Sequence, residues 1–148
     1  MRLMVFVAAL AVVATPVAAG DWRIGSVEAR GAVLIDVANI RQLGTTTKVA
    51  WSAIARSSND DSGAAYYLTR DEYDCQQETI TNTSFMTFSL EGRSLATSHE
   101  RQATEFIAPG TANERILRDV CRGTFRPKSW NDPSTFVREF RSTSFQQY

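Results

Sequence analysis

The hydrophobic pattern of this chain changes its period at Pro109-Gly110. Before that point apolar and polar residues alternate, most clearly over Ile80–Leu90, where Met86 and Phe88 share one side. Alternation with a period of two is typical of a half-buried β-strand. After that point apolar residues recur at the spacing of an α-helix. Strands followed by helices predict an α+β domain, in which a helix from the C-terminal half of the chain packs on an antiparallel sheet.

The expected strands are short segments of alternating polarity that are rich in β-branched or aromatic residues. They are Trp22–Ala29, Ala32–Val37, Thr45–Ala55, Tyr66–Thr69, Asp71–Gln77, Ile80–Leu90 and Arg93–Ser98. Asn39 to Gly44 interrupts the pattern, Arg56–Gly63 is a polar loop, and Glu91-Gly92 is typical of a hairpin turn.

A helix is expected from Thr111 to Gly123. Thr111 suits the N-cap position and Glu114, three residues later, completes a capping box. Gly123 is a suitable residue for the helix end. The apolar stripe of this helix consists of Ile116, Leu117, Val120 and Cys121.

A second, shorter helix is expected at about 133–141. Asp132 can cap it, and Pro133 suits the first helical position. Its apolar face is narrow and consists of Phe136, Val137 and Phe140.

The N-terminal segment Met1–Ala19 has the features of a secretory signal peptide. Arg2 precedes an apolar stretch, and Val17-Ala18-Ala19 is a small-residue cleavage site. The apolar stretch is shorter than the roughly 20 residues that span a bilayer. We therefore expect cleavage after Ala19, an exported chain in the periplasm or outside the cell that does not span a membrane after processing, and a single domain over residues 20–148 with its core at about 22–123.

Export would place Cys75 and Cys121 in an oxidising compartment, where they can form a disulfide. Two alternatives are a metal-binding pair and a catalytic thiol assisted by His99. Zinc requires four ligands, and His99 is the one histidine of the sequence. Cys75 is expected on the same strand face as Tyr73, and Cys121 lies on the helical stripe, so a bond between them would join the late helix to the sheet.

The sequence contains no recognisable catalytic motif, so we expect a protein that is not an enzyme, and we assign no metal, no cofactor and no ligand-binding residue. Its 16 basic and 16 acidic residues balance, which argues against nucleic-acid binding. The acidic groups at Asp60-Asp61 and over 71–74 lack the ligand spacing of a calcium loop. Asn82-Thr83-Ser84 matches a glycosylation acceptor but lies in an expected strand.

The three tryptophans are candidates for a binding face. They are Trp22, Trp51 and Trp130. The position of Trp51 in the middle of an alternating strand instead favours packing in the core.

Several of these features, taken in order, resemble the surface-adhesin protein E-like family of small exported bacterial proteins. They are Trp22, Ile35-Asp36, Glu72-Tyr73-Asp74-Cys75, Gly92, Pro109-Gly110-Thr111 and Asp119-Val120-Cys121, so the resemblance covers roughly Trp22–Cys121. It implies an antiparallel sheet with a helix held by a disulfide, and it transfers Cys75 and Cys121 as that structural bond. It also implies an outer-surface adhesin that binds host matrix and serum proteins and forms a homodimer.

Together these observations predict an exported, non-enzymatic domain that binds a protein or cell-envelope partner in the manner of an adhesin. The alternative is a periplasmic module that binds a small molecule or a metal.

Overall fold

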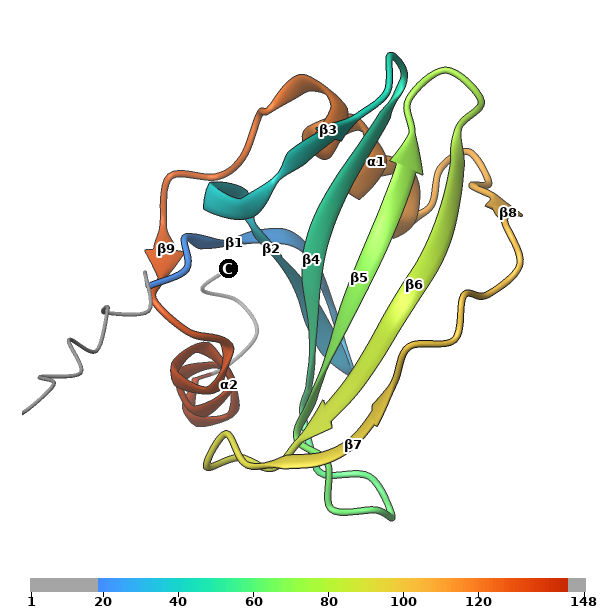
Figure 1. The fold of residues 1–148 in the computed structure, drawn as a ribbon. Helices are drawn as coiled ribbons and strands as arrows, with labels where there is room; N and C mark the ends of the chain where they lie inside the picture. Colours follow the sequence, from blue (N-terminus) through green and yellow to red (C-terminus); the bar gives the residue numbers. More distant parts are fainter. Residues whose placement is uncertain (1–18, 144–148) are drawn as a thin grey trace, which may run out of the picture.

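The computed structural model describes residues 19–143 of the 148-residue chain and confirms the α+β class and the antiparallel sheet. In this part of the chain nine strands form one sheet, and two α-helices pack on it (Figure 1). The strands are β1 (Trp22–Glu28), β2 (Gly31–Asp36), β3 (Arg41–Leu43), β4 (Thr47–Arg56), β5 (Tyr66–Asp74), β6 (Thr79–Phe88), β7 (Ser94–Ser98), β8 (Glu105–Phe106) and β9 (Ser129–Trp130). The helices are α1 (Ala112–Arg122) and α2 (Pro133–Ser142), and a 3-10 turn, η1, spans Val37–Asn39. Apart from Ala19, the expected signal peptide lies outside the described residues.

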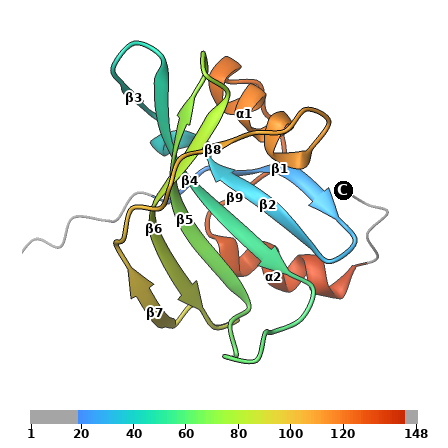
Figure 2. The same ribbon diagram turned by 90° about the vertical axis from the view of Figure 1, so that its right-hand side faces the viewer.

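The strands follow the order β7-β6-β5-β4-β2-β1-β9, and every pair is antiparallel. Figure 2 shows β7 beside β6 at one end of the sheet. In addition, β3 pairs with β4 and β8 pairs with β6. The expectation that residues 39–44 only interrupt the pattern is wrong, because β3 lies within them. Strands of two or three residues are too short to produce a periodic signal, so β3, β8 and β9 are defined by their pairing partners.

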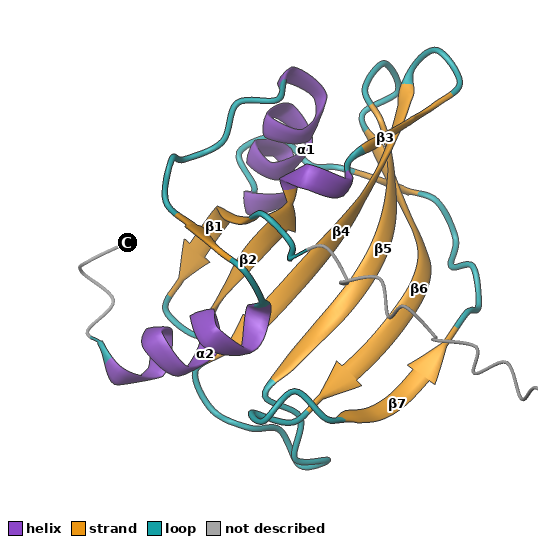
Figure 3. Cartoon of the chain, turned by 60° about the vertical axis from the view of Figure 1, so that its left-hand side comes forward, coloured by secondary structure: helices purple, strands orange, loops and turns teal. Residues whose placement is uncertain are grey.

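Each face of the sheet carries one helix, at different ends of the strands (Figure 3). Neighbouring residues of a strand point to opposite faces. In β2, Leu34 packs in the cluster that contains α2, whereas Ile35 packs in the cluster that contains α1. We refer to these two sides as the α1 face and the α2 face.

The ends of α1 are formed by the residues that the sequence predicts. The Thr111 hydroxyl accepts a hydrogen bond from the Glu114 amide at 3.3 Å, and the Glu114 carboxylate accepts one from the Gly110 amide at 2.7 Å. Gly123 ends the helix with a φ of 70°, a left-handed conformation that a glycine adopts without steric cost. The helix buries Ile116, Leu117 and Val120 against the sheet.

A lysine from the sheet caps the other end of α1, a contact that the sequence does not predict. The ammonium group of Lys48 in β4 donates to the carbonyl oxygens of Val120 and Cys121, at 3.1 and 2.9 Å. These carbonyls belong to the last turn of the helix, where the helix dipole favours a cation.

We expect Lys48→Met to lower the free energy of unfolding by about 1 kcal/mol, because it leaves these carbonyls without a charged donor. Urea denaturation measures this loss. Lys48→Arg keeps a cationic donor and should lose less, and equal losses for the two variants would contradict the capping role.

Helix α2 is more deeply buried than its narrow apolar face suggests. Phe136 and Val137 are fully buried, and Phe140 is 2% exposed. These side chains lie over Ala53 and Ala55 of β4 and belong to the same cluster. The small alanine side chains leave room for the aromatic rings, so α2 packs close to the strands. Within residues 19–143, no helix is long and apolar enough to cross a membrane.

The predicted disulfide between Cys75 and Cys121 is present, with the two Cα atoms 5.8 Å apart. It joins α1 to the sheet, as expected, but Cys75 does not lie in a strand. β5 ends at Asp74, whose carboxylate accepts hydrogen bonds from the amides of Gln76 and Gln77 and so holds a turn. Both cysteines are half-buried at the edge of the layer between helix and sheet.

Candidate functional site

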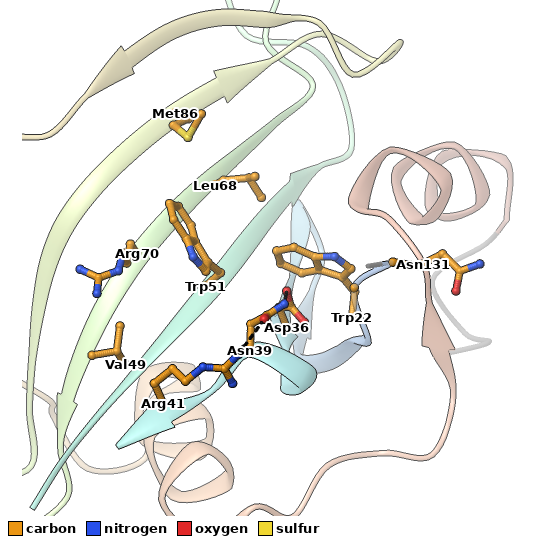
Figure 4. Close-up of a pocket in the computed structure, with 12 residues that line it drawn as sticks. Trp22, Asp36, Asn39, Arg41, Val49, Trp51, Leu68, Arg70, Met86 and Asn131 are labelled. Carbon is orange, nitrogen blue, oxygen red and sulfur yellow. Dashed lines mark hydrogen bonds between the residues drawn. The ribbon is translucent and has the colours of Figure 1, made fainter. Parts of the chain in front are cut away.

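A groove of about 720 Å³ opens on the α2 face, beyond the part of the sheet that α2 covers (Figure 4). We call it the tryptophan groove. Its apolar lining includes Ala19, Trp22, Val49, Trp51, Leu68 and Met86. Its polar lining includes Asp36, Asn39, Arg41, Arg70 and Asn131.

Strand register brings the wall of the groove together from three neighbouring strands. Trp51 lies opposite Arg70 of β5, and Ala53 lies opposite Leu68. Leu68 in turn lies opposite Met86 of β6. Directly opposite residues share a face and approach to about 5 Å, so these side chains form two adjoining rows.

Helix α2 covers one part of the α2 face and leaves another part open. It packs in one cluster with Ala55 and Tyr66, which lie opposite each other at the far ends of β4 and β5. Trp51 and Leu68 lie further along the same strands and are only partly buried. The expectation that Trp51 is a core residue is therefore only partly met. Trp22 and Trp130 are the more buried tryptophans, at 7% and 6% exposure.

Two arginines give the groove its positive charge. Arg70 is half-buried beside Trp51 and donates to the Thr83 hydroxyl at 3.3 Å. Arg41 donates to the carbonyls of Ala38 and Ile40. Neither guanidinium forms an ion pair with a carboxylate of residues 19–143.

Glu72, two residues after Arg70 in β5, is already paired. Glu72 accepts two hydrogen bonds from Arg101, at 3.1 and 2.7 Å. This guanidinium lowers the pKa of Glu72, against the opposing effect of burial. Arg101 forms the ion pair with Glu72, whereas Arg70 contributes only a weaker Coulomb attraction to this carboxylate, so its guanidinium donors are not taken up by Glu72.

The carboxylate of Asp36 is the buried charge of the groove. Asp36 is 5% exposed, and it accepts hydrogen bonds from the Asp21 amide at 3.3 Å and the Asn39 side chain at 2.7 Å. Both donors are neutral, and among the described residues no cation pairs with this carboxylate. A buried carboxylate without a cation is unusual because desolvation penalises its charge.

Cys75 and His99, the two residues of the alternative catalytic-thiol site, make different contacts in the structure. The sulfur of Cys75 is bonded to Cys121 and has no free thiol. His99 is exposed, and its Nδ1 lies 3.3 Å from the hydroxyl of Ser84. The disulfide thus replaces both the metal-pair and the catalytic-thiol alternatives for Cys75.

The acidic residues that were considered for calcium binding accept hydrogen bonds from other residues of the fold. The Asp60 carboxylate accepts hydrogen bonds from Ser62, Ala64 and Tyr67, which hold its loop and lower its pKa well below the usual range. The Asp71 carboxylate accepts from Ser52, Thr69 and Asn82 on the α1 face. Within residues 19–143, no three His, Cys, Asp or Glu side chains are placed to hold a metal ion.

The arrangement of the groove suits a ligand that combines an apolar group with an anionic one. Trp51, Leu68 and Met86 offer apolar surface that residues 19–143 leave partly exposed. Arg70 offers a planar guanidinium beside it, and such a group binds carboxylates through two parallel hydrogen bonds. Of these residues, the sequence indicates only Trp51 as a binding candidate and Met86 only as part of an alternating strand, because their proximity depends on strand register.

Comparison with known proteins gives a family but no individual relative. No curated protein and no solved structure matches the chain significantly. Residues 22–122 match the family model described as surface-adhesin protein E, and this segment runs from the first residue of β1 to the last residue of α1. The match covers well over half of the chain and agrees with the family that the sequence features indicate. The chain therefore belongs to the surface-adhesin protein E family.

Proposed function

We propose that this protein is an exported, non-enzymatic module that binds a protein of the cell envelope or the cell's surroundings through the tryptophan groove. Its family is one of surface adhesins, which supports an adhesin-like role. The observation that carries the proposal is Arg70, a half-buried guanidinium that forms no ion pair with a carboxylate of residues 19–143 and is held beside Trp51 in an open apolar wall. Aromatic residues and arginines of this kind contribute most of the binding energy at protein interfaces.

The charges of the groove indicate the chemistry of the partner. Arg41 and Arg70 line it, while the one lining carboxylate, Asp36, is buried and already hydrogen-bonded. The complementary surface is a segment with an acidic side chain for Arg70 next to an apolar or aromatic side chain for Trp51 and Met86. Charge complementarity of this kind sets register and raises the rate of association.

Site-specific photo-crosslinking tests the location of the site. A benzophenone amino acid replaces Met86, which lines the groove, or Phe85, which is 37% exposed on the opposite face. In cells that export the protein, we expect a covalent protein adduct from position 86 and none from position 85. An adduct from position 85 alone would contradict the groove as the binding site.

Point variants then test the chemistry with the partner identified by its adduct. We expect Trp51→Ala to weaken binding by about 30-fold, as for a tryptophan hot spot, whereas Phe85→Ala leaves it unchanged. Arg70→Glu should abolish binding of an acidic segment, and Arg118→Glu on the exposed side of α1 is the matched control. Isothermal titration calorimetry measures the affinity of each variant and of its control. Tighter binding by Arg70→Glu would contradict an acidic binding segment in the partner.

A small anionic molecule is the second candidate ligand. The volume of the groove, about 720 Å³, lies within the range of small-molecule sites, about 300–1,000 Å³. Mass spectrometry of the position-86 product separates the two candidates. A protein adduct supports the adhesin-like role, and an increase of a few hundred daltons supports the small molecule.

A further inference from the structure

The buried carboxylate of Asp36 lies next to the point at which the signal peptide is expected to be cut. The Asp21 amide nitrogen donates to Asp36 Oδ1 at 3.3 Å. Successive amide nitrogens are no more than about 3.7 Å apart, so the Gly20 nitrogen lies within about 7 Å of that oxygen. Gly20 is the first residue after the predicted cleavage site.

We propose that cleavage after Ala19 supplies the cation that the buried Asp36 carboxylate lacks. Hydrolysis of the Ala19–Gly20 amide by a signal peptidase consumes one water. It leaves a carboxylate on the released segment and a new α-amino group on Gly20, which is protonated at neutral pH. The mature N-terminus then neutralises Asp36 and fixes the start of β1 against the wall of the groove.

The structure holds Gly20 in place in two further ways. Its nitrogen donates to the carbonyl oxygen of Asn131, at 3.1 Å, beside β9. A Cβ atom on residue 20 would lie 2.3 Å from Nε1 of Trp22, so the indole ring packs directly on the glycine. An ammonium group has three donors and can keep the bond to Asn131 while it turns another toward Asp36.

The other charged groups around this end already have roles. Asp21 pairs with Arg23 at 2.8 Å, and hydrogen bonds from Arg23 lower the pKa of Asp21. Asp132 caps α2 through Ser134 and Thr135. Arg41, which lines the groove, donates to Asn39. Asp36 differs from these groups in being buried, at 5% exposure, and it forms no ion pair with a cation of the described residues.

The stability that the Gly20 ammonium adds by pairing with Asp36 is expected to decrease as the pH rises above neutrality. Pairing with Asp36 raises the pKa of the α-amino group above its unfolded value of about 7.7–8.0. While Asp36 is ionised, the added stability is therefore fully present below about pH 7.7, and it is lost as the pH rises through the raised pKa of the α-amino group in the folded protein.

The test compares two forms of the chain that differ by one residue. One begins at Gly20, and the other begins at Ala19, which is exposed and places the ammonium one residue further along the chain from Asp36. Both keep a nitrogen donor at Gly20 for Asn131. At pH 6.5 we expect the longer form to melt about 3–8 °C lower, and at pH 10.5 we expect equal melting temperatures.

Variants at the two acidic residues identify the group responsible. In an Asp36→Asn background the two forms should melt at the same temperature at both pH values. In an Asp21→Asn background, which removes the partly exposed carboxylate of the next residue, the difference at pH 6.5 should remain. N-terminal sequencing of the exported protein should begin at Gly20.

Four results would overturn the proposal. They are equal melting temperatures at pH 6.5, a difference that persists at pH 10.5, the same difference in the Asp36→Asn background, and an exported chain that begins at another residue. The proposal does not depend on the ligand of the groove, so it can fail while the binding function stands.

Discussion

Removal of the disulfide is expected to lower the free energy of unfolding by about 4 kcal/mol, within the range of 2–5 kcal/mol typical for small secreted domains. Cys75 and Cys121 are 46 positions apart in the chain, and the bond restricts the loop between them in the unfolded chain. It is also the covalent link between the C-terminal end of α1 and the turn after β5. We expect Cys75→Ala/Cys121→Ala to melt about 10–20 °C below the native protein, as measured by circular dichroism.

Reductant provides the control for this experiment. The native protein in excess reductant should melt at nearly the temperature of the double variant, and reductant should not change the double variant. A double variant that melts with the oxidised native protein would show that the sheet and α1 are held by their apolar contacts alone. Two titratable thiols in the exported protein would contradict the bond itself.

Truncation of the largest fully buried side chain is expected to cost about 3–5 kcal/mol. Phe136 in α2 has no exposed surface, and its ring contacts those of Trp130 and Phe140, at centroid distances of 4.8 and 5.4 Å. Phe136→Ala removes these contacts and leaves a cavity between α2 and the sheet. Urea denaturation followed by circular dichroism and tryptophan fluorescence measures the effect.

Phe136→Ala also tests whether α2 unfolds together with the sheet. α2 lies beyond the segment matched by the family, which ends at residue 122. We expect a single transition shifted as a whole, since α2 shares one apolar cluster with β1, β2 and β4. A separate early loss of helix signal would instead mean that α2 unfolds on its own. Phe106→Ala, at a side chain that is 84% exposed, is the matched control and should leave stability unchanged.

The sequence-based prediction succeeded where a residue acts on its near neighbours in the chain. Thr111 and Asp132 cap the two helices as predicted, because a cap bonds to an amide within three residues. The face shared by Val49, Trp51 and Ala53 also follows from local alternation. The disulfide was predictable because an exported chain with two cysteines has one intramolecular pairing available.

Contacts between distant segments were beyond prediction from the sequence. Lys48 caps α1 from 72 positions away, and no local pattern distinguishes it from an exposed lysine. Asp74 ends β5 one residue before Cys75, although the alternating pattern continues. The hydrogen bonds of Lys48 form only after the chain has folded, whereas those of Asp74 to Gln76 and Gln77 are local and were masked by the continuing alternation.

By itself, the amino-acid sequence determined the fold class, both helices, the disulfide and the family, because these depend on periodicity, caps and short motifs. Only the tertiary structure decided that α2 covers one end of its face and leaves Trp51, Leu68 and Arg70 open. It also decided that Asp36 is buried beside Gly20. The physical reason is that a groove and a buried charge are properties of strand register and helix placement, which bring together residues that the sequence keeps apart.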